Sequence, residues 1–194
     1  MIRLTRPKCP HPAALENKNY KHPKNKAALL EASSGKCMYC ESKFVAIDHG
    51  DVEHILPKSK DKFPHLEFEW SNHGISCTKC NGAKSDKYDK NTPFINPYDE
   101  DPSDFLVAQY FYISAKKGNE RGRLTILEID LNRTDLIEKR QELLSRVTDT
   151  MLSIGKTQNE KLKNLALLEL KNSASANSEY SMVVSAHLAA HGII

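Results

Sequence analysis

The stretch that decides the fold runs from Cys37-Met38-Tyr39-Cys40, through Asp51-Val52-Glu53-His54, to Cys77-Thr78-Lys79-Cys80-Asn81-Gly82-Ala83-Lys84. Two Cys-x-x-Cys pairs bracket an acidic residue that is followed directly by a histidine. Four thiolates complete the tetrahedral shell that zinc prefers and leave no open position for water or substrate. The pairs Cys37/Cys40 and Cys77/Cys80 therefore predict a structural zinc site.

The composition of the 194-residue chain is typical of a globular protein, with 39% hydrophobic residues, 27% charged residues and a net charge of +3. No apolar run is long enough to span a membrane, and residues 1–8 lack the apolar core of a signal peptide. We therefore expect a cytoplasmic protein, folded as one compact unit. Thiols stay reduced in that compartment, which favours metal binding over disulfides. The leftover Cys9 is predicted to be a plain thiol.

The front of the chain predicts short elements around the cysteines. Residues 1–20 hold three prolines and few apolar residues, so we expect an extended arm. A proline in the first turn favours a helix over Pro23–Ala32. Strands are expected at 44–47 and 52–56, and a helix from about Cys77. A short stretch before Cys77 gives the order strand, loop, short strand, helix.

The rear of the chain predicts a connector, a hairpin and three helices. Prolines keep 91–104 from being helical for long. We expect a hairpin that pairs 107–114 with 123–129. Apolar spacing then predicts helices from Asn132 or Thr134 to Ile154, from 158 to 171, and from 178 to 191, with Gly155 and Gly192 as stops. The predicted class is α+β, divided into an arm and helix (1–36), a module (37–95) and a rear part (96–194).

The neighbours Glu53 and His54 are the candidates for chemistry. A histidine exchanges its proton near neutral pH and suits the removal of a proton from water, while a carboxylate binds a hard divalent cation. An acidic residue next to a histidine is, by itself, more often a half-exposed pair in a strand. The residues around the pair decide between these two interpretations.

The surrounding pattern resembles the HNH (ββα-metal) endonuclease superfamily with four-cysteine zinc knuckles. The matching motifs are Val52-Glu53-His54-x-x-Pro57-Lys58-Ser59, Trp70-x-Asn72 and Cys77-x-x-Cys80-Asn81-x-x-Lys84. More narrowly, the chain resembles the PtuB-type nucleases that partner an ATPase in Septu and some retron anti-phage defence systems. That narrower likeness rests on looser motifs, among them Gly35-x-Cys37-x-Tyr39-Cys40-Glu41 and Leu131-Asn132-Arg133.

The resemblance implies a zinc-stapled ββα core with an N-terminal helix and a C-terminal cap of three helices. It also implies the roles of the site residues. His54 would be the general base, Glu53 and Asn81 would bind the catalytic divalent metal, and Asn72 would fix the loop that orients His54. The lysines Lys58 and Lys84 would contact phosphate, and Lys60 would join them as a backbone clamp.

The third signature position holds Asn81 where other members have histidine. An amide oxygen favours Mg²⁺ or Mn²⁺ over zinc at that position. A strict pleat would also point Glu53 and His54 to opposite faces, so either the strand is irregular or Asp51 shares the metal. His73 is expected to be a surface imidazole rather than an extra phosphate contact.

The function that follows is metal-dependent hydrolysis of phosphodiester bonds in nucleic acid, with DNA favoured over RNA, in anti-phage defence. The implied partner is an ATPase of the PtuA type, and the near-neutral helical half is where that contact or a homodimer seam is expected. Two alternatives stay open. One is a zinc-ribbon module that binds nucleic acid without cutting it, and the other is a homing or mobile-element HNH nuclease.

Overall fold

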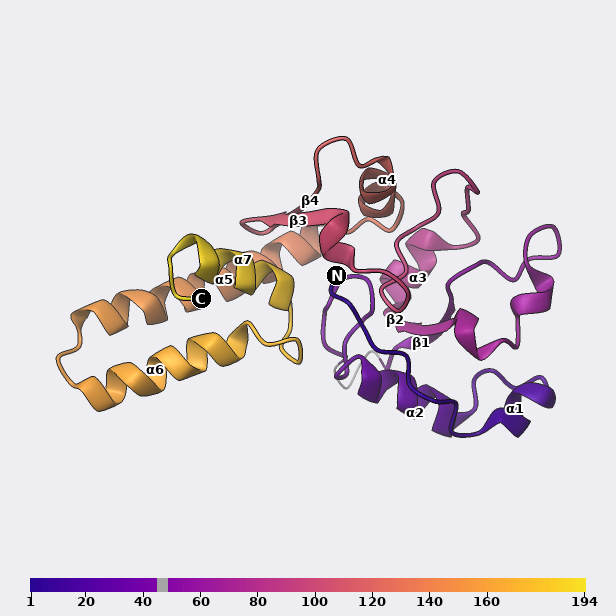
Figure 1. Cartoon of the computed structure of the whole chain (residues 1–194), viewed down its shortest axis with the longest axis horizontal. Helices are drawn as coiled ribbons and strands as arrows, with labels where there is room; N and C mark the ends of the chain where they lie inside the picture. The colour runs from indigo at the N-terminus through magenta and orange to yellow at the C-terminus, as the bar shows by residue number, and fades with distance from the viewer. Residues whose placement is uncertain (45–48) are drawn as a thin grey trace.

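The computed structural model describes residues 1–44 and 49–194. Figure 1 shows an elongated molecule, with the front of the chain at one end and a pair of long helices at the other. The strand predicted at 44–47 lies almost wholly outside the described residues. Within the described parts of the chain, no helix is long and apolar enough to cross a membrane.

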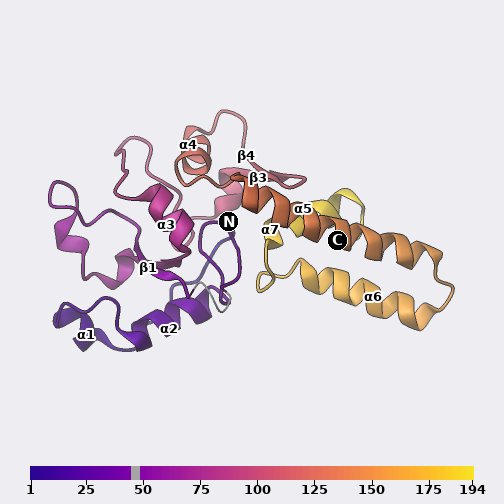
Figure 2. The ribbon, with the colours of Figure 1, turned by 180° about the vertical axis from the view of Figure 1, so that it is seen from behind.

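In the part of the front module that the structure describes, two paired strands are followed by a helix, in the predicted order of strand, loop, short strand and helix. Strand β1 (Asp51–His54) pairs antiparallel with β2 (His73–Ser76), so that His54 lies opposite His73. Short 3₁₀ turns, η1 (Pro64–Leu66) and η2 (Trp70–Asn72), occupy the loop between the strands. Helix α3 (Thr78–Lys84) then packs against β1 (Figure 2).

The N-terminal part contains one predicted and one unpredicted helix. Helix α2 (Pro23–Ala32) has the predicted bounds and packs against β2. The arm is not extended throughout, because Pro12–Glu16 forms the short helix α1. The Nδ1 atom of His11 accepts a hydrogen bond from the backbone N–H of Ala14 at 3.2 Å and so caps this turn. Histidine is an uncommon cap, which explains why the pattern of prolines alone missed the helix.

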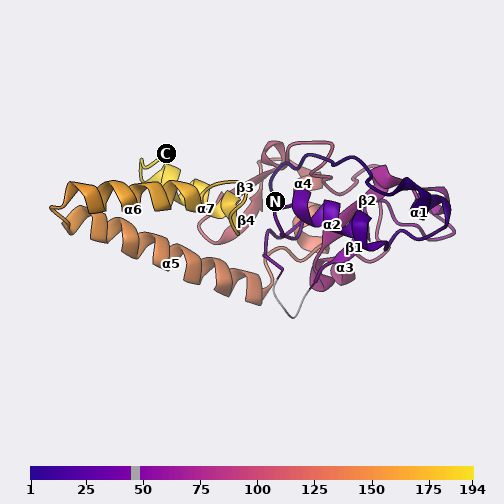
Figure 3. The ribbon, with the colours of Figure 1, turned by 90° about the horizontal axis from the view of Figure 1, so that it is seen from below.

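The rear part contains a hairpin and four helices. The hairpin consists of β3 (Leu106–Gln109) and β4 (Tyr112–Ala115), and the helices are α4 (Glu120–Glu128), α5 (Thr134–Lys156), α6 (Glu160–Ser173) and α7 (Ser181–Ala190). Helices α5 and α6 run side by side away from the body, as Figure 3 shows from below. The predicted cap of three helices is confirmed as α5, α6 and α7.

The predicted pairing of 107–114 with 123–129 is wrong. Both strands of the hairpin come from 106–115, where Tyr110 adopts a positive φ of 53° in the tight turn. The second predicted strand is the helix α4. Its start is fixed by Asn119, whose side-chain oxygen accepts a hydrogen bond from the backbone N–H of Gly122 at 2.8 Å. The cap residue, rather than the ambiguous alternation, decides the local structure.

Helix α5 starts and ends differently from the prediction. Asn132 does not cap it, because its side chain is hydrogen-bonded to the backbone of Ile113 in β4, with Oδ1 accepting at 2.9 Å and Nδ2 donating at 2.7 Å. Gly155 does not stop the helix either, since α5 continues to Lys156. A glycine inside a helix costs about 1 kcal/mol, which the packing of α5 on α6 and α7 offsets here.

The cysteine knuckle and the C-terminal segment meet at a buried ion pair. Glu41 accepts hydrogen bonds from the Met1 ammonium group at 2.7 Å and from the Ser181 hydroxyl at 2.6 Å. The Lys36 ammonium lies 3.6 Å from the same carboxylate and donates to the carbonyl oxygens of Ala176 and Ser178. Burial alone raises the pKa of Glu41, but these cations bring it below its ordinary value. The contact between the cysteine knuckle and the C-terminal segment therefore depends on a charged Glu41.

Replacing Glu41 by alanine is expected to lower the free energy of unfolding by about 3–5 kcal/mol, because it leaves the buried Lys36 ammonium without its carboxylate. Chemical denaturation of the zinc-loaded protein measures the change. The matched control is Glu160→Ala, which removes an exposed pair with Lys163 and should leave the stability unaltered. An equal effect of the two substitutions would contradict a contribution of the buried Glu41 ion pair to stability.

Candidate active site and metal centre

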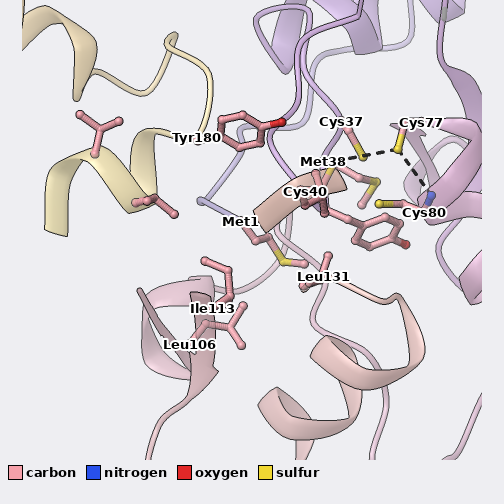
Figure 4. Close-up of a cluster of buried hydrophobic side chains, with 14 of the residues drawn as sticks. Met1, Cys37, Met38, Cys40, Cys77, Cys80, Leu106, Ile113, Leu131 and Tyr180 are labelled. Atoms are coloured by element: carbon pink, nitrogen blue, oxygen red, sulfur yellow. Dashed lines mark hydrogen bonds between the residues drawn. The ribbon is translucent and has the colours of Figure 1, made fainter. Parts of the chain in front are cut away.

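Four cysteines of the front module form a compact cluster. The sulfur atoms of Cys37, Cys40, Cys77 and Cys80 all lie within 4.8 Å of one another, and all four residues are buried (Figure 4). The Sγ atoms of Cys40 and Cys77 are 3.9 Å apart. A tetrahedral zinc ion with Zn–S bonds of about 2.3 Å requires sulfur atoms about 3.8 Å apart. The cluster therefore fits zinc, as the spacing of the cysteines predicted.

Arg133 adds a positive charge to this cluster. Its guanidinium donates to the sulfur of Cys80 at 3.4 Å and to that of Cys77 at 3.8 Å. Four thiolates around Zn²⁺ leave a net charge of about −2, which a neighbouring guanidinium partly offsets. Because Arg133 precedes the first residue of α5, these contacts also fix the start of that helix to the metal centre.

A pocket of about 520 Å³ opens beside β1, on the front module. Its walls include Glu53 and His54 from β1, Lys58 from the following loop and Asn81 from α3. Asp51 also lines it, as does Tyr20 from the N-terminal arm. The structure thus brings four of the predicted site residues to one cavity, whereas Asn72, Lys60 and Lys84 do not line it.

His54 is held in one orientation by a backbone oxygen. Its Nε2 atom lies 3.0 Å from the carbonyl oxygen of Glu67. Since a carbonyl only accepts, Nε2 carries the hydrogen and Nδ1 keeps its lone pair. Burial lowers the pKa of His54 to about 4, and His73 and Lys58 act in the same direction. The imidazole is therefore neutral near pH 7, in the state that a general base needs.

Asn72 closes the loop that follows His54. Its side-chain oxygen accepts from the backbone N–H of Leu56 at 2.7 Å, and its amide nitrogen donates to the carbonyl oxygens of Leu56 at 2.9 Å and Leu66 at 3.2 Å. The residue is buried, with 3% of its surface exposed. Asn72 thereby joins both ends of the loop whose carbonyl at Glu67 holds His54.

Glu53 and Lys84 form a buried ion pair. The Lys84 ammonium lies 2.6 Å from Oε1 of Glu53 and donates to the carbonyl oxygen of His54 at 2.9 Å. The Tyr39 hydroxyl donates to the same Oε1 at 3.4 Å. Burial raises the pKa of Glu53, and the Lys84 ammonium opposes that rise. Lys84 is only 1% exposed, so it contacts Glu53 rather than solvent; its predicted phosphate contact stays a prediction.

His73 is not the surface imidazole that we expected. It is fully buried, and its Nε2 lies 2.9 Å from the same Glu67 carbonyl that holds His54. His73 pairs with His54 across the two strands, and its imidazole is directed to the Glu67 carbonyl at the end of η1, so the side chain lies inside. The sequence pattern missed this because a four-residue strand has no exposed face when helix α2 and the loop cover it.

The two loop lysines differ in their surroundings. The Lys58 ammonium lies in the pocket wall and donates to Oε1 of Glu67 at 2.8 Å and to the Tyr20 hydroxyl at 3.0 Å. Lys60 is exposed and lies outside the pocket. Lys58 is therefore positioned at the site, whereas Lys60 is available only at its periphery.

Comparison with known proteins identifies the family. The model of the HNH endonuclease family matches residues 37–87, which hold both strands, α3 and all four clustered cysteines. The Septu protein PtuB of Bacillus thuringiensis is 32% identical to this chain over 97% of the chain and 82% of that protein's length. The chain belongs to the PtuB family. The PtuB of Bacillus mycoides strain KBAB4 is 26% identical over 64% of this chain and 52% of that protein.

The oxygen atoms at the pocket fit the divalent metal that HNH nucleases generally use. Glu53 offers a carboxylate, Asn81 an amide oxygen and Asp51 a second carboxylate at the same edge of β1, and such oxygen donors suit hard cations. The Lys84 ammonium and the Tyr39 hydroxyl both contact the Oε1 atom of Glu53. Asp51 accepts a hydrogen bond from the Thr78 hydroxyl at 3.3 Å, which fixes it beside α3.

Glu53 and His54 are neighbours in the sequence, yet both line the same pocket. Glu53 faces Tyr39 and Lys84, whereas His54 faces Tyr20 and His73, so the strand is regularly pleated. Both side chains still line the pocket because it lies against β1, one strand of a sheet that has two strands among residues 1–44 and 49–194. Glu53 and His54 can therefore share one pocket although their side chains point to opposite faces of a regular strand.

Proposed function

We propose that this PtuB-family chain is a metal-dependent endonuclease that hydrolyses phosphodiester bonds in nucleic acid, with DNA favoured, and that it is the cutting subunit of an anti-phage defence system in the cytoplasm. The observation that carries the proposal is the coincidence of the HNH match with a pocket that holds a neutral His54 beside Glu53 and Asn81.

In this proposal His54 removes the proton from the attacking water through Nδ1, while the Glu67 carbonyl holds the other ring nitrogen. Asn72 maintains the loop that carries that carbonyl. Glu53 and Asn81 would hold Mg²⁺ or Mn²⁺, which supplies stabilisation of the charge that develops on the phosphate and the leaving oxygen. Lys58 contacts the phosphate at the pocket wall, and Lys60 contacts the nucleic-acid backbone further out.

Removing either proposed metal ligand is expected to weaken Mn²⁺ binding at the pocket and to reduce cleavage at least about 100-fold. The substitutions are Glu53→Gln and Asn81→Ala, and the measurements are Mn²⁺ titration followed by electron paramagnetic resonance and cleavage of plasmid DNA and of RNA. Asn91→Ala, in the connector, is the control. Unchanged Mn²⁺ affinity in both variants would show that the metal binds elsewhere.

The same assay separates the alternatives. A zinc-ribbon module would bind DNA without cutting it at any Mg²⁺ or Mn²⁺ concentration. A homing or mobile-element nuclease would cut a particular sequence, so efficient cutting of random plasmid would count against it. Faster cutting of RNA than of DNA would reverse the preference that we propose.

We further propose that the chain works with an ATPase partner of the PtuA type, bound at the outer face of α6. Three leucines of this helix, Leu162, Leu165 and Leu168, are each more than half exposed, whereas Leu170 packs inward. The helix lies at the opposite end of the molecule from β1, so a partner bound there leaves the pocket open (Figure 1). Exposed leucines in a group indicate a protein contact.

The test is co-purification of the chain with such an ATPase, using the wild type and a variant with all three leucines changed to serine. Retention of the complex by the variant would exclude this face. Light scattering of the chain alone reports whether the same face instead joins two copies of the chain, and a stable dimer that the serine variant abolishes would favour a homodimer seam.

A further inference from the structure

The N-terminal arm, which lies outside the segment matched by the HNH family model, is bound along β2. Arg6 donates to the carbonyl oxygens of His73 at 2.6 Å and Trp70 at 3.1 Å. The Trp70 indole N–H donates in return to the carbonyl oxygen of Pro7 at 2.8 Å. These three hydrogen bonds fix the arm beside the strand that faces His54, and the chain then continues into the pocket wall at Tyr20.

Tyr20 contacts the proposed base and the proposed phosphate-binding lysine at once. Its ring packs edge-on against the His54 imidazole, with 4.6 Å between centroids and 73° between planes. The Lys58 ammonium donates to its hydroxyl at 3.0 Å and lies 4.3 Å from the centre of its ring. Lys58 also contacts the Glu67 side chain, and the Glu67 carbonyl holds His54. Tyr20, His54, Glu67 and Lys58 are therefore linked in a closed circuit of contacts.

We infer that Tyr20 is a positioning residue of the nuclease site, whose ring holds the His54 imidazole and whose hydroxyl holds the Lys58 ammonium at the pocket wall. This inference rests on the proposed function, because it assigns Tyr20 a role in that same reaction. The arm is therefore part of the site, and the segment matched by the family model does not contain all of it.

Tyr20 lies at the border between the core and the pocket. Its half-buried side chain packs against the hydrophobic core and also lines the pocket, whereas Tyr39, Tyr98 and Tyr180 are buried within the core. An ammonium over the face of an aromatic ring gains about 0.5–1 kcal/mol at an exposed site and more when desolvated. An edge-on pair of aromatic rings gains a similar amount. Both contacts act on side chains that the reaction uses, and the ring and the hydroxyl are separable by substitution.

The test compares Tyr20→Phe with Tyr20→Ala in the full-length, zinc-loaded protein. Phenylalanine keeps the ring and loses the hydroxyl, so we expect KM for plasmid DNA to rise about 3–10-fold with kcat nearly unchanged. Alanine loses both contacts, so we expect kcat to fall about 10–100-fold as well. Tyr112→Ala, on the exposed hairpin, is the control and should change neither constant.

Lys58 provides a second, independent comparison. If the hydroxyl acts through Lys58, then Lys58→Met and the double variant Tyr20→Phe/Lys58→Met should show the same KM, because the two residues act as one unit. Additive increases in KM would overturn the link. Loss of kcat in Tyr20→Phe equal to that in Tyr20→Ala would overturn the role of the ring.

A readout without substrate distinguishes failure of this inference from failure of the proposed function. The ring resonances of His54 in NMR spectra should shift in Tyr20→Ala and stay close to wild type in Tyr20→Phe, whether or not the protein cleaves nucleic acid. Unshifted resonances in a folded Tyr20→Ala would refute the positioning of His54. If the alanine variant does not fold, the phenylalanine variant and the Lys58 comparison still decide the role of the hydroxyl.

Discussion

Replacing His54 by alanine is expected to reduce cleavage of nucleic acid by about 10²–10⁴-fold while the zinc content and the folded state stay unchanged. The imidazole is neutral, its Nε2 is occupied by the Glu67 carbonyl, and its Nδ1 is the only nitrogen left to accept a proton. Alanine removes that acceptor without touching a cysteine ligand. Cleavage kinetics, zinc analysis and circular dichroism measure the three quantities.

The matched control for His54 is His65→Ala, because His65 is an exposed histidine in η1, in the loop that follows β1. It should cleave like the wild type. Full activity of a pure His54→Ala preparation would mean that another group serves as the base. If the wild type itself binds DNA and never cuts it, the zinc-ribbon interpretation replaces the nuclease.

Loss of zinc is expected to unfold the front module. Zinc binding contributes about 10–16 kcal/mol to the folding of zinc-finger peptides, which equals or exceeds the whole stability of a typical domain, about 5–15 kcal/mol. Cys77→Ser should have the same effect as a strong chelator, because Cys77 lies in the cluster and also caps α3, its sulfur accepting from the Cys80 N–H at 3.4 Å. Thermal denaturation with and without chelator measures the change.

Cys9→Ser is the control for the zinc experiment. Cys9 lies outside the cluster, where its thiol donates weakly to the side-chain oxygen of Asn25 at 3.6 Å. This variant should bind one zinc ion per chain and melt like the wild type. A protein stripped of all zinc that still melts at the wild-type temperature would refute a structural role for the metal.

The sequence predicted the parts of the fold that depend on local patterns. The bounds of α2 follow from a proline in its first turn and from local apolar residues, and the zinc cluster follows from the spacing of the cysteines. The hairpin was paired wrongly because strand alternation and helix periodicity agree over a segment as short as Arg123–Ile129. Only the Asn119 cap separates the two possibilities, and it depends on the turn before it.

The candidate site was predictable where it coincides with the motif and not where it depends on tertiary contacts. Glu53, His54, Lys58 and Asn81 do line one pocket. No pattern indicated that Lys84 would be buried against Glu53, because a lysine on a short helix is usually solvated. Tyr20 lies more than 30 residues from His54, and Arg133 more than 50 residues from Cys80, and no local signal links such positions.

The contact of Arg133 with the cysteine sulfurs joins the helical end of the molecule to the cysteine cluster. Helix α5 has 23 residues and is therefore about 34 Å long, and its first turn is fixed at the metal centre while its far end carries α6. The residue that follows Cys80 is Asn81, in the wall of the pocket, so the contact that anchors the helical end of the molecule lies one residue from the candidate site.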